Sequence, residues 1–198
     1  MALKAVVFDV GETLVDETLN WERAADACGV PRFTLMALVG AAIARGESHR
    51  RPFEWLGVEP PRGAFFNDEF YADALSTLSA LRGRGLRTGA VGNMAVAHED
   101  VVRPHVDFVA SSERWGVEKP APEFFARISE SFGLPPQEIA YVGDRVDNDV
   151  VPAAEAGMVA VFVRRGPWGR IHAGWPECAL AAVRVDSLAE LPDALRGF

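Results

Sequence analysis

The sequence has few cysteines, few lysines and no long apolar run. Its two cysteines, Cys28 and Cys178, lie far apart without C-x-x-C or metal-ligand spacing, so we expect free thiols in a reducing compartment. No stretch approaches the roughly 18 apolar residues of a membrane-spanning helix. The apolar run before Asp9 is too short for a signal peptide. These absences predict a cytoplasmic protein with no membrane partner.

Basic residues are also in deficit. The chain of 198 residues carries 20 Lys and Arg against 28 Asp and Glu, a net charge of -8 with a pI near 5.0. No stripe of Lys and Arg offsets this balance, so we expect no nucleic-acid partner. Hydrophobic residues make up 49% of the chain. They suffice for the core of one domain with a large insertion, or of two small domains.

Short apolar runs alternate with helical patterns along most of the chain. Residues 5–8 show no polar alternation, which is typical of a strand buried on both faces of a parallel sheet. Further strands are predicted at 86–93, 106–110, 138–142, 159–163 and near 182. Helices are predicted at 67–81, 98–105, 122–132, 150–156 and at the C-terminal end of 182–195. This alternation predicts βαβ units and an α/β fold with a parallel sheet.

Residues 17–70 interrupt that alternation. The spacing of apolar residues predicts a helix over 17–29 and a second one from Pro31 to Gly46, and a short basic and aromatic piece follows at 50–58. The block contains no strand-like run. We therefore predict a small all-helical insertion whose apolar faces pack on one another or over the crevice near Asp9.

Acidic residues follow two of the predicted strands. Asp9 comes directly after residues 5–8. Asp144 is the first acid of GDRVDND at 143–149, which follows the strand at 138–142. Ligands of open α/β sheets bind outside the carboxyl ends of the strands, so these acids converge in one crevice if the strands are neighbours. Unpaired carboxylates would repel one another there, and Mg²⁺, which prefers oxygen ligands, resolves the repulsion. Some of the residues 147–149 serve equally well as caps of the helix that begins near Val150.

Lysine is rare enough for its positions to be informative. Of the 20 basic residues only Lys4 and Lys119 are lysines. Lys119 lies in GVEKPAPEFF, where a compact charge on a flexible stem suits contact with a phosphate or a carboxylate. Lys4 is expected to be a surface residue at the start of a strand.

Four segments carry a family resemblance: FDVGETL at 8–14, VGN at 91–93, KP at 119–120 and GDRVDND at 143–149. In order and spacing they resemble the four motifs of the haloacid dehalogenase (HAD) superfamily of hydrolases. The resemblance implies a Rossmann-like three-layer α/β core, formed by residues 1–16 and 71–198. It also implies a helical cap domain at 17–70, inserted after the first strand.

The resemblance implies a phosphatase that acts on a small phosphorylated metabolite through an aspartyl-phosphate intermediate. Asp9 would attack phosphorus in line, and Lys119 would offset negative charge on Asp9 and on the phosphoryl oxygens. Mg²⁺ would bridge phosphate and enzyme through Asp9, the Gly11 carbonyl and Asp144.

Four more positions receive roles from the same resemblance. Asn148 and Asp149 would orient the second shell of the metal. Gly92 lies where the superfamily's phosphate-binding Ser or Thr stands, and Asn93 with nearby backbone amides would hold a phosphate oxygen. The cap would exclude water and select the leaving group.

Two positions depart from the superfamily pattern. Superfamily phosphatases carry a second Asp two residues after the nucleophile as general acid and base, and here that position is Gly11. Its loss predicts a slow or specialised enzyme, because general acid–base catalysis is worth about 10²- to 10⁴-fold in rate. Glu12 is a candidate substitute in a different register. Gly92 removes one hydroxyl contact to phosphate.

These departures leave other functions open. A non-catalytic or nearly inactive binding or regulatory module would retain the fold without turnover. A metal-independent 2-haloacid dehalogenase also lacks the second acid, although the acid-rich GDRVDND favours a metal site. The segment 164–174, RRGPWGRIHAG, is typical of a mobile surface loop, and its arginines suit an anionic substrate equally. Monomer and homodimer are both compatible with the sequence.

Overall fold

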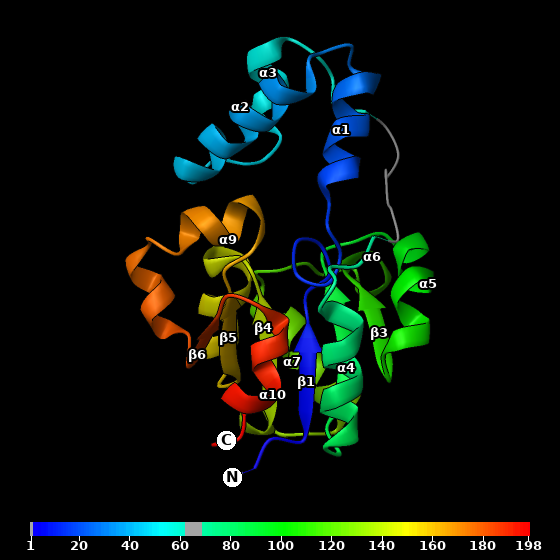
Figure 1. Ribbon diagram of the computed structural model, residues 1–198, viewed down its shortest axis with the longest axis vertical. Helices are drawn as coiled ribbons and strands as arrows, with labels where there is room; N and C mark the ends of the chain where they lie inside the picture. The colour runs from blue at the N-terminus through cyan, green and yellow to red at the C-terminus, as the bar shows by residue number, and fades with distance from the viewer. Residues whose placement is uncertain (1, 62–68) are drawn as a thin grey trace.

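The computed structural model describes residues 2–61 and 69–198, and a six-stranded parallel sheet forms its centre (Figure 1). The strand order is β3-β2-β1-β4-β5-β6. The strands are β1 (Ala5–Phe8), β2 (Arg87–Gly92), β3 (Phe108–Ser111), β4 (Ile139–Gly143), β5 (Val159–Val163) and β6 (Val183–Val185). The predicted Rossmann-like α/β core is confirmed.

Strand β1 lies between β2 and β4, and its four residues are buried. Its last residue, Phe8, pairs with Ala90 of β2 and Val142 of β4. The carboxyl ends of these three strands therefore lie at the same edge of the sheet. The residues that follow them meet in one place although they are more than 50 positions apart in the sequence.

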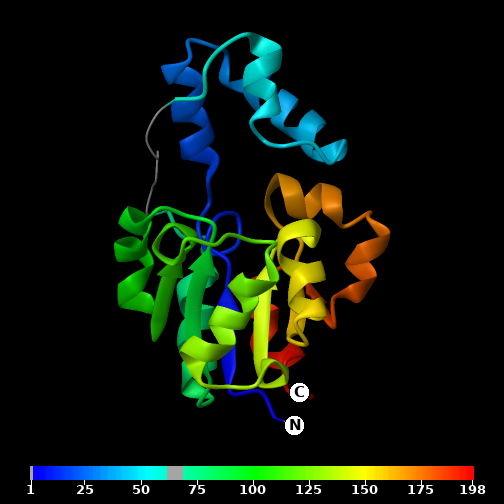
Figure 2. The ribbon, with the colours of Figure 1, turned by 180° about the vertical axis from the view of Figure 1, so that it is seen from behind.

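Helices cover both faces of the sheet, and the side chains of β1 alternate between them. Val6 and Phe8 pack with α4 (Ala74–Gly83) and α10 (Leu191–Ala194), in front of the sheet in Figure 1. Ala5 and Val7 pack with α7 (Pro122–Phe132) and α8 (Val151–Glu155), in front in Figure 2. Both faces of β1 are thus apolar, as its sequence predicts.

Three helices form the described part of the insertion, residues 17–61, beyond the carboxyl edge of the sheet (Figure 1). They are α1 (Thr18–Ala27), α2 (Arg32–Ala44) and α3 (Arg51–Leu56). They share a hydrophobic cluster with Trp168 of α9 (Gly166–His172), so the insertion also packs against the core. Val15 and Phe70 form an antiparallel bridge, which brings the two ends of the insertion together. The domain boundaries at 17 and 70 stay a prediction.

Two predicted helices differ in the structure, and one short helix is additional. The helix expected over 67–81 begins only at Ala74, because Phe70 is paired with Val15; Asn67 lies outside the described residues. The helix expected over 98–105 contains only a short α5 (Glu99–Val102) between two 3₁₀ turns. A further short helix, α6 (Ser112–Trp115), was not predicted.

The prediction of a mobile loop at 164–174 was wrong, because this segment contains α9. Arg165 is buried and donates to the Thr13 carbonyl at 2.9 Å and to Asp73 Oδ2 at 2.5 Å. Arg164 pairs with Asp186. Both arginines therefore have partners within the chain, and Arg165 joins α9 to the core.

No single helix in the described ranges is long and apolar enough to cross a membrane. The pair α1 and α2 passes the length and composition test only together, and it is bent by 116°.

Candidate active site

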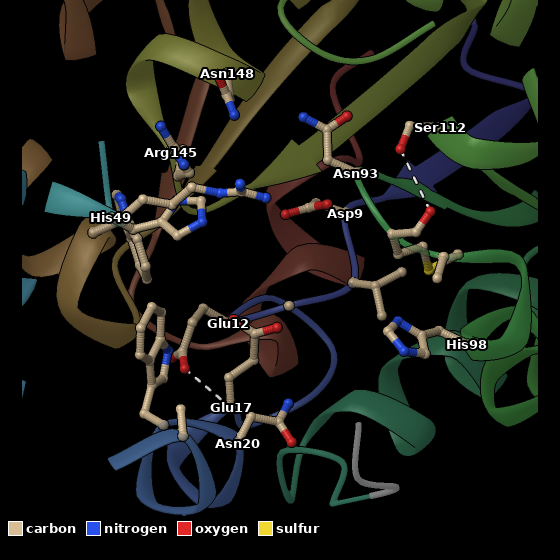
Figure 3. Close-up of a pocket in the computed structure, with 18 of the residues that line it drawn as sticks. Asp9, Glu12, Glu17, Asn20, His49, Asn93, His98, Ser112, Arg145 and Asn148 are labelled. Carbon is tan, nitrogen blue, oxygen red and sulfur yellow. Dashed lines mark hydrogen bonds between the residues drawn. The ribbon is translucent and has the colours of Figure 1, made fainter. Parts of the chain in front are cut away.

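A cleft of about 970 Å³ lies between the carboxyl edge of the sheet and the helical insertion. Asp9, which follows β1, lines its floor together with Lys119 and Asp144. Trp21 lines it from the insertion, and so does His49 (Figure 3). The predicted crevice at the strand ends therefore exists, and the insertion covers it.

Three carboxylates and one ammonium group form a buried cluster at the base of the cleft. One carboxylate oxygen from each of Asp9, Asp144 and Asp149 lies within 4.8 Å of the other two. Lys119 Nζ lies 2.8 Å from Asp9 Oδ1 and 2.6 Å from Asp149 Oδ1. The segments after β1, after β4 and before α7 thus meet at one point.

The charges of this cluster do not balance. Burial alone would lower the pKa of Lys119, but the carboxylates of Asp149 and Asp9 outweigh it and raise that pKa well above its usual value. Burial raises the pKa of Asp149 to about 6 against the opposing effect of Lys119. Burial, with the charges of Asp149 and Asp9, also raises the pKa of Asp144. Without further positive charge, the cluster favours protonated carboxyl groups.

The donor set of this cluster fits a hard divalent cation. Asp144 Oδ2 is buried and has no hydrogen-bond partner, while Asp144 Oδ1 accepts a 3.4 Å bond from Thr13 Oγ1. An unpartnered carboxylate oxygen beside two further carboxylates is costly unless a cation binds there. Oxygen ligands of this type suit Mg²⁺.

Two glycines make room for the carboxylates. A Cβ atom on Gly143 would collide with the carboxylate of Asp149, and one on Gly92 would lie 2.5 Å from Asp9 Oδ1. The absence of a Cβ atom on Gly143 therefore allows the Asp149 carboxylate to pack directly against the end of β4. Gly92 allows Asp9 to adopt this rotamer, so a Ser or Thr at position 92 would require the Asp9 carboxylate to turn.

Asn93 holds the segment that carries Lys119. Its Oδ1 accepts from the Lys119 backbone N–H at 2.8 Å, and its Nδ2 donates to the Lys119 carbonyl at 3.0 Å. The side chain of Asn93 thus fixes Lys119. Asn93 and Asn148 also line the cleft (Figure 3), as does Gly11. Sequence reasoning missed this positioning role, because no local pattern links positions 93 and 119.

Asp147, Asn148 and Asp149 lie in a π-helical turn, Val146–Val150, ahead of α8. Asp149 Oδ2 accepts from the Arg145 backbone N–H at 2.9 Å, while its Oδ1 binds Lys119. Asp147 pairs with Arg145 outside the cluster. Asp149 is therefore part of the buried carboxylate cluster itself.

Glu12 and Glu17 differ sharply in their surroundings. Glu12, at a positive φ of 54°, accepts hydrogen bonds from Tyr71 Oη at 2.7 Å and from the Glu17 backbone N–H at 3.1 Å. Burial, with the charges of Glu12 and Asp9, raises the pKa of Glu17 to about 8. Both residues line the cleft, and the sequence analysis did not single out Glu17.

His172 packs against the turn that follows Asp144 and accepts a hydrogen bond from it. It is buried, its Nδ1 accepts from the Val146 backbone N–H at 3.1 Å, and its ring stacks on Trp175 at 3.9 Å. Burial lowers the pKa of His172 to about 4, with Asp147 opposing and Arg145 assisting.

This shift predicts a stability loss in mild acid. The unfolded chain binds a proton near pH 6.5 but the folded chain only near pH 4, so stability is complete above about 6.5 and declines as the pH falls towards 4. Between pH 7.5 and 4.5 the wild type should lose about 2 kcal/mol more unfolding free energy than His172→Asn. Urea unfolding at both pH values measures this difference. Equal losses would mean that His172 is not buried in its neutral form.

The parallel sheet, the helical insertion and the buried acidic cluster together define a capped α/β enzyme. The haloacid dehalogenase-like hydrolase family matches residues 3–157. The chain therefore belongs to this family of hydrolases, and the family resemblance of its four motifs is confirmed.

A curated relative and two solved structures illustrate this membership. The chain is 32% identical to a glyceraldehyde 3-phosphate phosphatase of Methanopyrus kandleri, covering 84% of this chain and 86% of that protein. It resembles the crystal structure of a HAD phosphatase from Thermococcus onnurineus (TM-score 0.67, 22% identity, 98% and 99% of the two chains). It resembles L-2-haloacid dehalogenase from Xanthobacter autotrophicus to a similar degree (TM-score 0.69, 22% identity, 99% of both chains). The fold alone thus accommodates phosphatase and dehalogenase chemistry.

Proposed function

We propose that the protein is a Mg²⁺-dependent phosphatase that hydrolyses a small phosphorylated metabolite through an aspartyl-phosphate on Asp9. The observation that carries this proposal is the cluster in which Lys119 contacts Asp9 at 2.8 Å and the unpartnered Asp144 Oδ2 lies beside it. The sequence similarity to a phosphatase over most of both chains supports the same activity.

Each residue of the cluster has a part in this chemistry. Asp9 attacks phosphorus, and Lys119, whose Nζ lies 2.8 Å from Asp9 Oδ1, offsets negative charge on Asp9 and on the phosphoryl oxygens. Asp9, Asp144 and the Gly11 carbonyl would hold Mg²⁺, with Asp149 and Asn148 orienting its surroundings. When bound, the metal would supply positive charge that stabilises the phosphoryl group in the transition state.

Phosphate binding is assigned to the loop after β2. A Cβ atom on Gly92 would lie 2.5 Å from Asp9 Oδ1. Because glycine lacks this atom, backbone N–H groups there can approach a phosphoryl oxygen beside Asp9 closely. Asn93 fixes Lys119 beside the same oxygens. Residues of the insertion line the cleft opposite these groups, which suits a small substrate and limits the access of bulk solvent.

The carboxylate cluster disfavours the dehalogenase alternative. Halide displacement from carbon by Asp9 needs no cation, whereas three buried carboxylates around one ammonium group require additional positive charge. The non-catalytic alternative would keep the same metal site without turnover. The two alternatives therefore differ from the proposal in a single activity assay.

The test is the release of p-nitrophenol from p-nitrophenyl phosphate by the pure protein, with Mg²⁺ and with EDTA. We expect turnover that needs Mg²⁺ and is lost with EDTA. No turnover in either condition would contradict the phosphatase. Chloride release from 2-chloropropionate would then separate the dehalogenase from the non-catalytic module.

The proposal includes a cytoplasmic location and no nucleic-acid or membrane partner. Both cysteines are free thiols in the structure, which suits a reducing compartment, and the net charge of -8 disfavours nucleic acid.

A further inference from the structure

The space left by the missing side chain of residue 11 is filled by another acid. A Cβ atom on Gly11 would lie 2.6 Å from Glu17 Oε1 and 3.1 Å from Glu17 Oε2. The Glu17 carboxyl therefore occupies the volume into which a side chain at position 11 would project. Figure 3 shows the Glu17 side chain extending into the cleft towards Asp9.

The position of Glu17 is held by its backbone and not by its carboxyl. Glu17 is the N-cap residue of α1, but its side chain makes no capping hydrogen bond. Its backbone N–H donates instead to Glu12 Oε1 at 3.1 Å, and Glu12 is in turn held by Tyr71. The turn between β1 and α1 thus directs a carboxyl that serves no capping function into the cleft.

Glu12 is less suited to act on a substrate. One of its oxygens accepts from Glu17 N–H and the other from Tyr71 Oη. Its carboxylate is therefore committed to the turn, and its role is to position Glu17.

We infer that Glu17 is the general acid and base of this enzyme, taking the place of the acid that Gly11 lacks. This inference rests on the proposed phosphatase function. Glu17 is the first residue of the insertion. In the phosphatases whose motifs this chain resembles, the same role belongs to an Asp two residues after the nucleophile.

The chemistry balances with one proton carried by Glu17. In the first step Asp9 forms a bond to phosphorus, the bond from phosphorus to the leaving oxygen breaks with its electron pair on that oxygen, and Glu17 donates the proton that makes the alcohol. In the second step a water oxygen forms a bond to phosphorus, the bond from phosphorus to the Asp9 oxygen breaks with its electron pair on Asp9, and the water gives one proton to the Glu17 carboxylate. Inorganic phosphate and the original Asp9 and Glu17 result.

The test compares two substrates that differ mainly in their leaving group. Phenyl phosphate lacks the nitro group of p-nitrophenyl phosphate and so depends more on a proton donor. In single turnovers, Glu17→Gln should slow release of phenol by about 10²-fold and release of p-nitrophenol by less than about tenfold. Glu22→Gln makes the same change on α1, at a residue that pairs with Arg32, and should leave both rates unchanged.

A second variant tests the position directly. The atoms nearest to a Cβ at Gly11 are the end of the flexible Glu17 side chain, so Gly11→Asp combined with Glu17→Gly has room for its carboxyl. This double variant should hydrolyse phenyl phosphate at least tenfold faster than Glu17→Gln does. Circular dichroism establishes that each variant is folded.

The outcomes separate the two proposals. Equal losses on both substrates, no loss in Glu17→Gln, or a folded double variant without recovery would each overturn the role of Glu17. If the wild type hydrolyses neither ester, the phosphatase proposal itself fails.

Discussion

Replacing Asp9 by Asn is expected to lower kcat for phosphate esters by at least about 10⁴-fold, because the amide cannot form the aspartyl-phosphate. Asn has the same shape as Asp, and the neighbouring Gly92 leaves room for either. The loss should therefore appear in kcat and not in folding. The measurement is steady-state release of p-nitrophenol with Mg²⁺, together with the thermal unfolding temperature.

A matched control residue, Asp147, lies outside the buried carboxylate cluster. Asp147→Asn makes the same chemical change in the turn after β4, where the carboxylate pairs with Arg145 and not with Lys119. We expect less than about a threefold change in kcat for this variant. The Asp9 variant should still bind Mg²⁺ weakly, since Asp144 and the Gly11 carbonyl remain. Unchanged activity in Asp9→Asn would remove the proposed mechanism.

Much of the fold and part of the site could be predicted from the sequence. The strands at 5–8 and 138–142 are continuous apolar runs that end at Asp9 and in front of Asp144. In a parallel sheet such ends share one edge, so the meeting of the two acids follows from local patterns and topology. Lys119 was detectable because lysine is rare in this chain.

Other features depend on contacts between distant segments. Asn93 binds the backbone of Lys119 across 26 positions, and Trp168 of α9 packs against the insertion. The register of Glu17 against Gly11 depends on the turn that Glu12 makes at a positive φ. None of these contacts has a local sequence signal, which is why the sequence suggested Glu12 and a loop instead.

Lys119→Met is expected to impair both stability and catalysis. The side chain of Lys119 is 2% exposed and lies within 2.8 Å of two carboxylates. Removing it leaves Asp9 and Asp149 buried without their cation, which should cost about 3–5 kcal/mol of unfolding free energy. It also removes the charge that faces the phosphoryl group, so kcat should fall by about 10²- to 10³-fold.

The pH dependence separates this charge effect from a packing defect. The destabilisation should be largest at neutral pH and shrink as the pH falls below about 6, because protonated carboxyl groups need no cationic partner and burial already raises the pKa of Asp149 to about 6. Urea unfolding of Lys119→Met and wild type at pH 7.5 and 5 measures this. A penalty that does not change with pH would indicate lost packing.

Lys119→Arg tests whether charge alone is enough. Arg keeps the positive charge, but its planar guanidinium is larger than the buried ammonium site between Asp9 and Asp149, and the two are not interchangeable in such a site. We expect it to recover part of the stability and little of the kcat. Full recovery of kcat would mean that any cation near Asp9 suffices. Loss of stability with unchanged kcat in Lys119→Met would make Lys119 a structural ion pair and not a catalytic residue.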